Sequence, residues 1–101
     1  IYRMNISGSD IERLTDGSGQ AANPCWHPNG QIMVFSWTRG LEPGNFNIFM
    51  MDVAKRELTQ LTYGAGRNQN PVWAPDGVHI AFCSTRGGSP QIWTMLADGT
   101  Q

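Results

Sequence analysis

The sequence predicts an all-β fold, and three observations support this prediction. The 12 glycines and 6 prolines fall in clusters between short apolar runs, a pattern typical of short strands joined by tight turns. No segment of about a dozen residues keeps the apolar spacing of an amphipathic helix. A sequence repeat with an offset of 47 residues runs through the chain. Together these features favour small sheets that recur along the sequence.

The repeat is clearest in a turn motif and in the strand that follows it. Residues 23–30 read Asn-Pro-Cys-Trp-His-Pro-Asn-Gly, and residues 70–77 read Asn-Pro-Val-Trp-Ala-Pro-Asp-Gly. The same offset of 47 residues places Phe35 on Phe82. Self-similarity with a period of about 20 to 50 residues is the signature of repeat architectures.

One loop changes length between the repeats. Ile48 matches Ile92 at an offset of 44 residues, because the loop at residues 40–47 is longer than its counterpart at residues 87–91. The sequences on both sides of the loop stay in register. Repeat proteins vary their surface in this way without disturbing the core.

Each repeat contains four strand-like runs separated by turn signals. Pro-Asn-Gly at residues 28–30 and Pro-Asp-Gly at residues 75–77 predict tight turns, because Pro presets one backbone angle and Gly takes a positive φ. Residues 54–56 lack a glycine, so we expect a different turn there. The expected strands, in chain order, cover residues 1–5, 11–15, 22–26, 32–37, 46–52, 57–62, 69–73, 79–84 and 91–96.

Four strands in about 45 residues form one propeller blade, and the radial repetition of such blades forms a propeller. The runs at residues 32–35 and 48–51 are continuously apolar, as expected for a sheet that is buried on both faces between neighbouring blades. A two-layer sandwich would show alternating apolar and polar residues instead. The predicted division of the chain is the end of one blade at residues 1–21, a second blade at 22–64 and a third, incomplete blade at 65–101.

The repeat resembles that of the TolB-type β-propellers over the whole chain. His27 and Asn29 depart from the usual Ser and Asp of the motif, and neither change threatens the fold. The resemblance implies propellers that usually have six blades, in bacterial envelope proteins and in peptidases of the prolyl oligopeptidase type. It also implies a location in the bacterial periplasm or cell envelope, which the residues themselves leave open. The residues that carry it are Pro24, Trp26, Pro28, Gly30, Phe35 and Arg39 in one copy and Pro71, Trp73, Pro75, Asp76, Gly77, Phe82 and Arg86 in the next.

Two blades cannot close a propeller, which needs about four to eight blades. The chain is therefore either an excerpt of a longer propeller or a subunit that assembles. A head-to-tail interface whose rotation closes forms a ring, so we expect a cyclic homotrimer with six blades. In that ring, residues 12–15 of one copy would complete a blade of its neighbour. One of the two equivalent strands, residues 1–5 or 91–96, would then be surplus.

Composition and motifs exclude several classes of function. A net charge of −1 with 15% charged residues argues against a nucleic-acid surface, and the longest apolar run, at residues 32–35, is too short to insert into a membrane. Cys25 and Cys83 are interpreted as small hydrophobic residues, although a disulfide between them stays open. His27 and His79 lack partners at metal-ligand spacing, and no Gly-x-Ser-x-Gly motif occurs. We therefore expect no metal, no cofactor and no enzymatic activity.

The repeat also sorts candidate core residues from candidate binding residues. Trp26 and Trp73 share a repeat position, as do Phe35 and Phe82, so all four are expected to pack between blades. The loops at residues 16–21, 40–47, 63–69 and 87–90 are expected on one face of the propeller, where a partner would bind. The candidate partner-binding residues on that face are Trp37, Arg39, Leu41, Glu42, Phe46, Tyr63, Arg67 and Arg86.

The repeat bears on the expected roles of three of these candidates, Trp37, Arg39 and Arg86. Trp37 aligns with Ser84, so the repeat does not require it, and it is expected as an exposed contact residue. Arg39 and Arg86 recur after equivalent strands. They either bond neighbouring backbone or acidic groups, which we favour because it explains the repetition, or form a ring of cations that binds a carboxylate or an acidic segment of a partner.

Three functions remain open at this stage. The first is a non-enzymatic propeller scaffold that binds a protein or peptide through its loop face. The second is an accessory propeller segment of a serine peptidase, which would gate access of substrates to a separate hydrolase domain. The third is a propeller fragment that assembles with itself and has no selected ligand.

Overall fold

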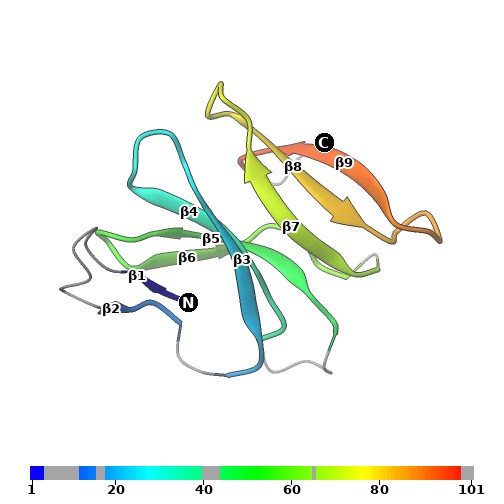
Figure 1. Ribbon diagram of the computed structural model, residues 1–101, viewed down its shortest axis with the longest axis horizontal. Coiled ribbons are helices and arrows are strands. Elements are labelled where there is room, and N and C mark those ends of the chain that lie inside the picture. The colour runs from blue at the N-terminus through cyan, green and yellow to red at the C-terminus, as the bar shows by residue number, and fades with distance from the viewer. Residues whose placement is uncertain (4–11, 16–17, 40–43, 65, 99–101) are drawn as a thin grey trace.

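In a computed structural model of the protein, residues 1–3, 12–15, 18–39, 44–64 and 66–98 are described, and they form antiparallel strands without a helix (Figure 1). The predicted all-β fold is confirmed. Within these residues, no helix could cross a membrane. The strands are β1 (Tyr2–Arg3), β2 (Glu12–Arg13), β3 (Ala21–Trp26), β4 (Ile32–Trp37), β5 (Asn47–Asp52), β6 (Glu57–Gln60), β7 (Asn68–Trp73), β8 (His79–Ser84) and β9 (Gln91–Leu96).

The strands form three sheets that follow one another along the chain. β1 pairs with β2, the strands β3 to β6 form a four-stranded sheet in sequential order, and β7 to β9 form a three-stranded sheet in the same order. Figure 1 shows the two larger sheets next to each other, and β7 lies against β3, β4 and β5. An antiparallel meander of four strands, as in β3 to β6, is the architecture of a propeller blade, and β7 to β9 follow the same order with three strands.

The Asn-Pro dipeptide of each repeat forms an irregularity in the first strand of the sheet. The register of β3 on β4 shifts between Ala22 and Cys25, and β7 on β8 shifts in the equivalent place. At these shifts Asn23 has φ 57° and Asn70 has φ 56°. Among residues with a side chain, Asn tolerates this left-handed conformation best, which gives a physical reason for its recurrence.

The turns that follow β3 and β7 have the predicted chemistry. Gly30 and Gly77 have φ values of 73° and 68°, which are accessible to glycine at little cost. The side chain of Asn29 accepts a hydrogen bond from the backbone N–H of Gln31 at 2.8 Å. In the turn between β5 and β6, which has no glycine, Arg56 takes the positive φ of 57°.

The central strands β4 and β5 of the four-stranded sheet are buried on both faces, which explains the continuous apolar run of β4. Neighbouring side chains of β4 point to opposite sides, so Met33 and Phe35 enter one core cluster whereas Val34 enters the other. The first cluster also contains Leu14, Trp37, Phe49, Met51 and Val53, and the second contains Ile48, Leu61, Trp73, Ile80, Phe82 and Met95. The second cluster joins the two larger sheets.

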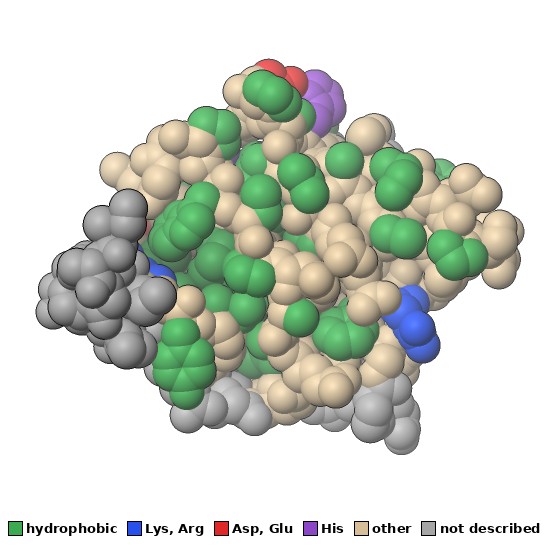
Figure 2. All heavy atoms as spheres, viewed as in Figure 1, with side chains coloured by type: hydrophobic (Ala, Val, Ile, Leu, Met, Phe, Trp, Pro, Cys, Tyr) green, Lys and Arg blue, Asp and Glu red, His purple; other side chains and the backbone are tan. Residues whose placement is uncertain are grey.

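The three-stranded sheet leaves apolar side chains in contact with solvent. Val72 is 53% exposed and Ile92 is 72% exposed. Within the described part of the chain, β9 pairs with β8 alone, so its other edge is unpaired. Figure 2 shows a surface with many hydrophobic side chains and few charged ones.

Candidate binding site on the loop face

The connections β4–β5, β6–β7 and β8–β9 lie at the same end of the two sheets, which we call the loop face. Backbone hydrogen bonds join these connections to one another. The N–H of Asn68 donates to the carbonyl of Phe46 at 2.9 Å, and the N–H of Thr85 donates to the carbonyl of Arg67 at 3.1 Å. The loop face is therefore a continuous surface built from segments that are distant in the sequence.

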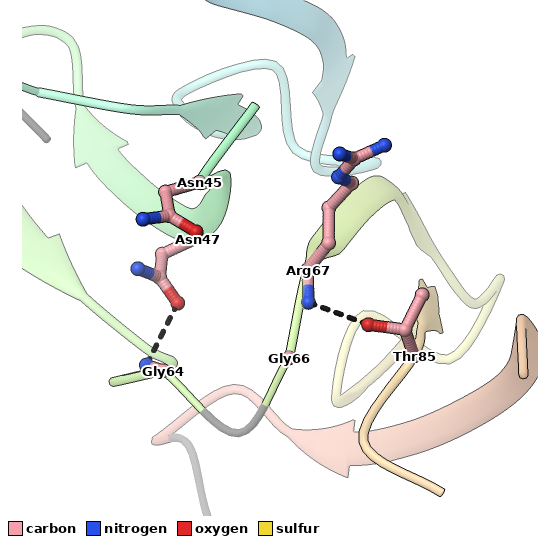
Figure 3. A pocket seen from close by; sticks show the side chains of 6 residues that line it. All are labelled: Asn45, Asn47, Gly64, Gly66, Arg67 and Thr85. Atoms are coloured by element: carbon pink, nitrogen blue, oxygen red, sulfur yellow. Dashed lines mark hydrogen bonds between the residues drawn. The ribbon is translucent and has the colours of Figure 1, made fainter. Parts of the chain in front are cut away.

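A cleft of about 580 Å³ opens on the loop face between the two larger sheets (Figure 3). Its walls come from three connections. The segment before β5 lies on one side, the segment before β7 forms the base and the other side, and Thr85 follows β8. The lining residues are Asn45, Asn47, Gly64, Gly66, Arg67 and Thr85.

Two buried asparagines fix the base of the cleft. The side-chain oxygen of Asn47 accepts hydrogen bonds from the Thr62 hydroxyl at 2.9 Å, from Gly64 N at 3.1 Å and from Asn68 Nδ2 at 3.1 Å. Asn68 Nδ2 also donates to the carbonyl of Gly64 at 2.7 Å. Buried polar groups whose hydrogen bonds are all made hold a loop in one conformation.

The segment before β7 approaches Thr85 so closely that it requires glycine. Gly66 has φ 89°, and a Cβ atom there would lie 2.5 Å from the Thr85 hydroxyl oxygen. The same hydroxyl accepts a hydrogen bond from the N–H of Arg67 at 2.8 Å. Thr85 thus holds the backbone that carries the Arg67 side chain.

Arg86 contacts neighbouring side chains of the protein rather than the backbone or acidic groups that the sequence favoured. Its Nε donates to the Ser84 hydroxyl at 3.0 Å and its Nη2 donates to Asn68 Oδ1 at 3.2 Å. The guanidinium also lies over the rings of Phe82 and Trp93, with carbon-to-centroid distances of 5.1 and 5.3 Å. The positively charged guanidinium of Arg86 therefore has its contacts within the protein.

Arg39 differs from its repeat counterpart. Its guanidinium lies 5.2 Å from the ring centroid of Trp37, and its backbone has φ 33°. Trp37 occupies the repeat position of Ser84, so it offers a ring face where the second repeat offers a hydroxyl. Arg39 is exposed and keeps this stacking contact.

The expectation that Trp37 is an exposed contact residue is wrong. Trp37 is 2% exposed, and its Nε1 donates to the carbonyl of Ser18 at 2.7 Å. Its ring meets the ring of Phe49 edge-on, with centroids 5.3 Å apart. An indole that finds both apolar contacts and a hydrogen-bond acceptor is stable in a core.

The other candidate binding residues are distributed unevenly. Tyr63 is 78% exposed on the loop face, Arg67 is exposed in the cleft, and Phe46 is half-buried beside it. Leu41 and Glu42 lie outside the described residues. No partner is bound, so the binding role of all these residues stays a prediction.

Of the four predicted core aromatics, Trp26 is the exception. Phe35, Phe82 and Trp73 are buried, whereas Trp26 is 41% exposed. Trp73 packs against the preceding blade, where its ring meets that of His27 edge-on at a centroid distance of 4.6 Å. Among the described residues, no turn of a preceding sheet packs against Trp26 in the way that the β3–β4 turn packs against Trp73.

Sequence analysis missed the contribution of His27, which joins the two larger sheets at the end opposite the loop face. Asn29 N donates to His27 Nδ1 at 3.0 Å, so the neutral ring carries its hydrogen on Nε2 and donates to the carbonyl of Gly77 at 2.9 Å. Gly77 leaves room for the ring, since a Cβ there would lie 2.6 Å from Nε2. Only the departure from the usual Ser at this position could have drawn attention to it.

The described titratable groups do not form a metal-binding cluster. No three His, Cys, Asp or Glu side chains there are placed to hold a metal ion. Cys25 and Cys83 are half-buried free thiols. The pKa of Asp76 is lowered from 3.8 to about 2, mainly by the hydrogen bond from the N–H of Val78 and also by His79. Asp76 lies in the β7–β8 turn, away from the cleft.

Comparison with known proteins agrees with this architecture. The family model of the TolB beta propeller domain matches residues 1–101. A solved TolB-type structure from Agrobacterium tumefaciens is similar, with a TM-score of 0.87 and 32% identity over 99% of this chain and 35% of that chain. TolB from Acinetobacter baumannii gives a TM-score of 0.84 and 30% identity over 99% of this chain and 24% of that chain.

A more distant likeness concerns the fold alone. A chain from a nidogen–laminin complex superposes with a TM-score of 0.76 and 14% identity over 99% of this chain and 37% of that chain. No curated protein matches the sequence significantly. The chain spans about a quarter to a third of the length of the TolB structures. By the family match along its whole length and the sheets that it forms, the chain belongs to the TolB-type β-propeller family.

Proposed function

We propose that the chain is a segment of a non-enzymatic propeller scaffold that binds a protein or peptide through its loop face. The observation that carries the proposal is the cleft on that face, which three separate connections form together. Its lining offers amide, hydroxyl and guanidinium groups, and the described part of that lining contains no histidine or carboxylate that could act as an acid or base. Family membership supports a location in the bacterial periplasm or cell envelope.

The surface around the cleft suits an extended polypeptide. The exposed ring of Tyr63 directly precedes Gly64 of the lining, so a peptide in the cleft could also contact an aromatic side chain. Exposed aromatic residues contribute disproportionately to protein–peptide affinity because they bury a large area with few rotatable bonds. The fixed base of the cleft reduces the entropy that binding would cost.

Peptide selection followed by loop-face substitution tests this proposal. Random peptides displayed on phage are selected on the immobilised 101-residue chain, and the affinity of the enriched peptides is measured by calorimetry. Tyr63→Ala is expected to weaken binding about fivefold or more, as for an aromatic contact residue. Val78→Ala, which removes exposed apolar surface at the opposite end, is the matched control. The proposal fails when no peptide is enriched, or when Val78→Ala weakens binding and Tyr63→Ala does not.

A second candidate function, self-assembly, is favoured by the uncovered surface of the β7–β9 sheet. Ile92 and Val72 are exposed there, and the outer edge of β9 is unpaired within the described residues. The repeat places β1 at the position of β9, and β1 pairs with β2. In a cyclic homotrimer of the free chain, β2 of a second copy would pair with β9 and complete its blade.

The mass of the free chain in solution tests self-assembly. Sedimentation velocity at micromolar concentration is expected to give three times the mass of one chain. Ile92→Lys places a charge on the uncovered sheet and is expected to dissociate the trimer, whereas Val78→Lys places the same charge in an exposed turn and is expected to leave it intact. A monomer of the unaltered chain at these concentrations would contradict the trimer.

A further inference from the structure

Arg67 is an exposed cation that the structure holds in a defined place. Its guanidinium lies against the backbone of Gly44, because a Cβ atom on Gly44 would be only 3.1 Å from Arg67 Nη2. Gly44 has φ 89°, a conformation that favours glycine. Among the described residues, no side-chain or backbone oxygen accepts a hydrogen bond from this guanidinium, and the described lining of the cleft contains no acidic residue.

Two further groups of the cleft have unused hydrogen-bonding capacity. Asn45 lines the cleft on the side opposite Arg67 (Figure 3), and no described residue hydrogen-bonds to its side-chain amide. The Thr85 hydroxyl accepts the N–H of Arg67, which leaves its own hydrogen for a ligand. A guanidinium, an amide and a hydroxyl around one opening supply donors in excess of acceptors.

The first repeat provides an internal comparison for this site. The bond from Arg67 N to the Thr85 hydroxyl, at 2.8 Å, recurs as a bond from Gln20 N to the Thr38 hydroxyl, also at 2.8 Å. The two described repeats therefore share this backbone frame. The Arg side chain replaces a Gln, and Asn45 belongs to the loop that is longer than its counterpart. A repeated frame that carries unrepeated side chains is typical of a surface that varies for binding rather than for stability.

We propose that this cleft binds a carboxylate carried by a peptide partner, with Arg67 in a paired contact to both oxygens and Asn45 donating a further hydrogen bond. The planar fork of a guanidinium matches a carboxylate in geometry and charge. The carboxylate is either an Asp or Glu side chain or the carboxyl terminus of the peptide. This inference rests on the proposed function and names the chemistry that the loop face recognises.

Amide NMR spectra of the labelled 101-residue chain, recorded during titration with four short peptides, test the carboxylate. One pair is acetyl-Gly-Asp-Gly-amide and its Asn counterpart, and the other is acetyl-Gly-Gly-Gly with a free or an amidated carboxyl terminus. At least one carboxylate peptide is expected to shift the signals of Gly64, Gly66 and Arg67 saturably, while its neutral counterpart does not. The pair that responds identifies the source of the carboxylate.

Substitution of Arg67 tests the cation itself. Arg67→Gln is expected to weaken binding of the responding peptide about tenfold, which is typical of losing a charge-assisted hydrogen bond. Arg67→Lys keeps the positive charge without the planar guanidinium, and its affinity for the peptide is expected to lie between those of the unaltered chain and Arg67→Gln. Lys55→Gln removes an equal charge from the β5–β6 turn at the opposite end and is expected to change the affinity less than about twofold, since a distant exposed charge is screened. Unchanged amide spectra elsewhere show that each variant remains folded.

Two results would overturn the carboxylate site. The first is equal binding of charged and neutral peptides, and the second is an affinity that Arg67→Gln leaves unchanged. If the binding of selected peptides still depends on Tyr63, either result contradicts the carboxylate site but leaves the proposed peptide-binding scaffold in place. Failure of the peptide selection, in contrast, removes the proposed function itself.

Discussion

The two repeats of the chain share a backbone and differ in what covers them. Trp26 and Trp73 occupy the same repeat position after the same Asn-Pro bulge, yet Trp26 is 41% exposed and Trp73 is 7% exposed. Trp73 has the β3–β4 turn, with His27, to pack against. A repeat position therefore fixes where a side chain points, whereas the neighbouring blade determines whether that side chain is buried.

The same contrast appears in the polar network next to the loop face. In the second repeat, Asn68, Ser84 and Arg86 hydrogen-bond to one another in the interior. Ala21, Trp37 and Arg39 stand at the equivalent positions of the first repeat, where Trp37 fills the space with its ring. The same backbone therefore carries an apolar packing contact in one blade and a polar hydrogen-bond network in the next.

The largest expected effect comes from truncating the two equivalent tryptophans. Trp73→Ala is expected to lower the free energy of unfolding by about 3–5 kcal/mol, because it leaves a cavity in the core between the sheets. Trp26→Ala removes a side chain that is partly solvated, and a loss within about 1 kcal/mol is expected. Urea denaturation followed by circular dichroism measures both values. Equal losses would show that Trp26 is covered in solution.

A second prediction concerns the polar network that only one repeat contains. Asn68→Ala is expected to destabilise the protein by about 2–3 kcal/mol, because it removes the buried acceptor of the Ser84 hydroxyl hydrogen and the amide that donates to the carbonyl of Gly64. Asn45→Ala, at an exposed asparagine of the same cleft, is the control, with an expected change below about 0.5 kcal/mol. The same denaturation measurement applies, and a neutral Asn68→Ala would mean that water replaces the amide.

The smallest expected effect distinguishes the two Pro-x-Gly turns by their response to acid. Asp76 has its pKa lowered to about 2 by the N–H of Val78 and by His79, whereas Asn29 holds the equivalent turn without a charge. Because the folded pKa lies below the ordinary value of 3.8, the contribution of Asp76 to stability is complete above about pH 4 and declines as the pH falls toward 2.

Comparison with Asp76→Asn isolates this contribution. The difference in urea midpoint between the unaltered chain and Asp76→Asn is expected to be small at pH 5 and to shrink further between pH 4 and about 2. Asn29→Asp is expected to introduce a similar acid dependence into the first repeat. A difference that stays constant down to pH 2 would show that the carboxylate has no favourable partners in the folded state.

Several features of the fold and site could be predicted from the sequence because they depend on local chemistry. The Pro-Asn-Gly and Pro-Asp-Gly turns follow from the preferences of three neighbouring residues, and the apolar run of β4 follows from burial on both faces. Repetition favoured a structural role for Arg39 and Arg86 alike, yet only Arg86 hydrogen-bonds to Ser84 and Asn68, whereas Arg39 stacks on Trp37. Arg67 was predicted as a binding residue from its place in a variable loop, and the structure places it in the cleft.

Other features required contacts between segments far apart in the sequence. The burial of Trp37 depends on the Ser18 carbonyl and on Phe49, which a repeat alignment does not pair with it. The contact between His27 and Gly77 joins two different sheets, so no local pattern indicates it. The repeat predicted which loops share a face, but it did not indicate which of their polar groups hydrogen-bond to one another, because those bonds depend on the tertiary packing of the loops.

The strands, their turns and the repeat that makes neighbouring sheets alike follow from the amino-acid order, since these depend on backbone preferences and on apolar spacing within about 45 residues. Which equivalent side chains are buried, and which polar groups meet in the cleft, depends on how the sheets pack. Burial and hydrogen bonding are properties of the space between blades, and that space exists only when β7 lies against β3, β4 and β5. Trp26 and Trp73 are alike in sequence and different in the molecule for this reason.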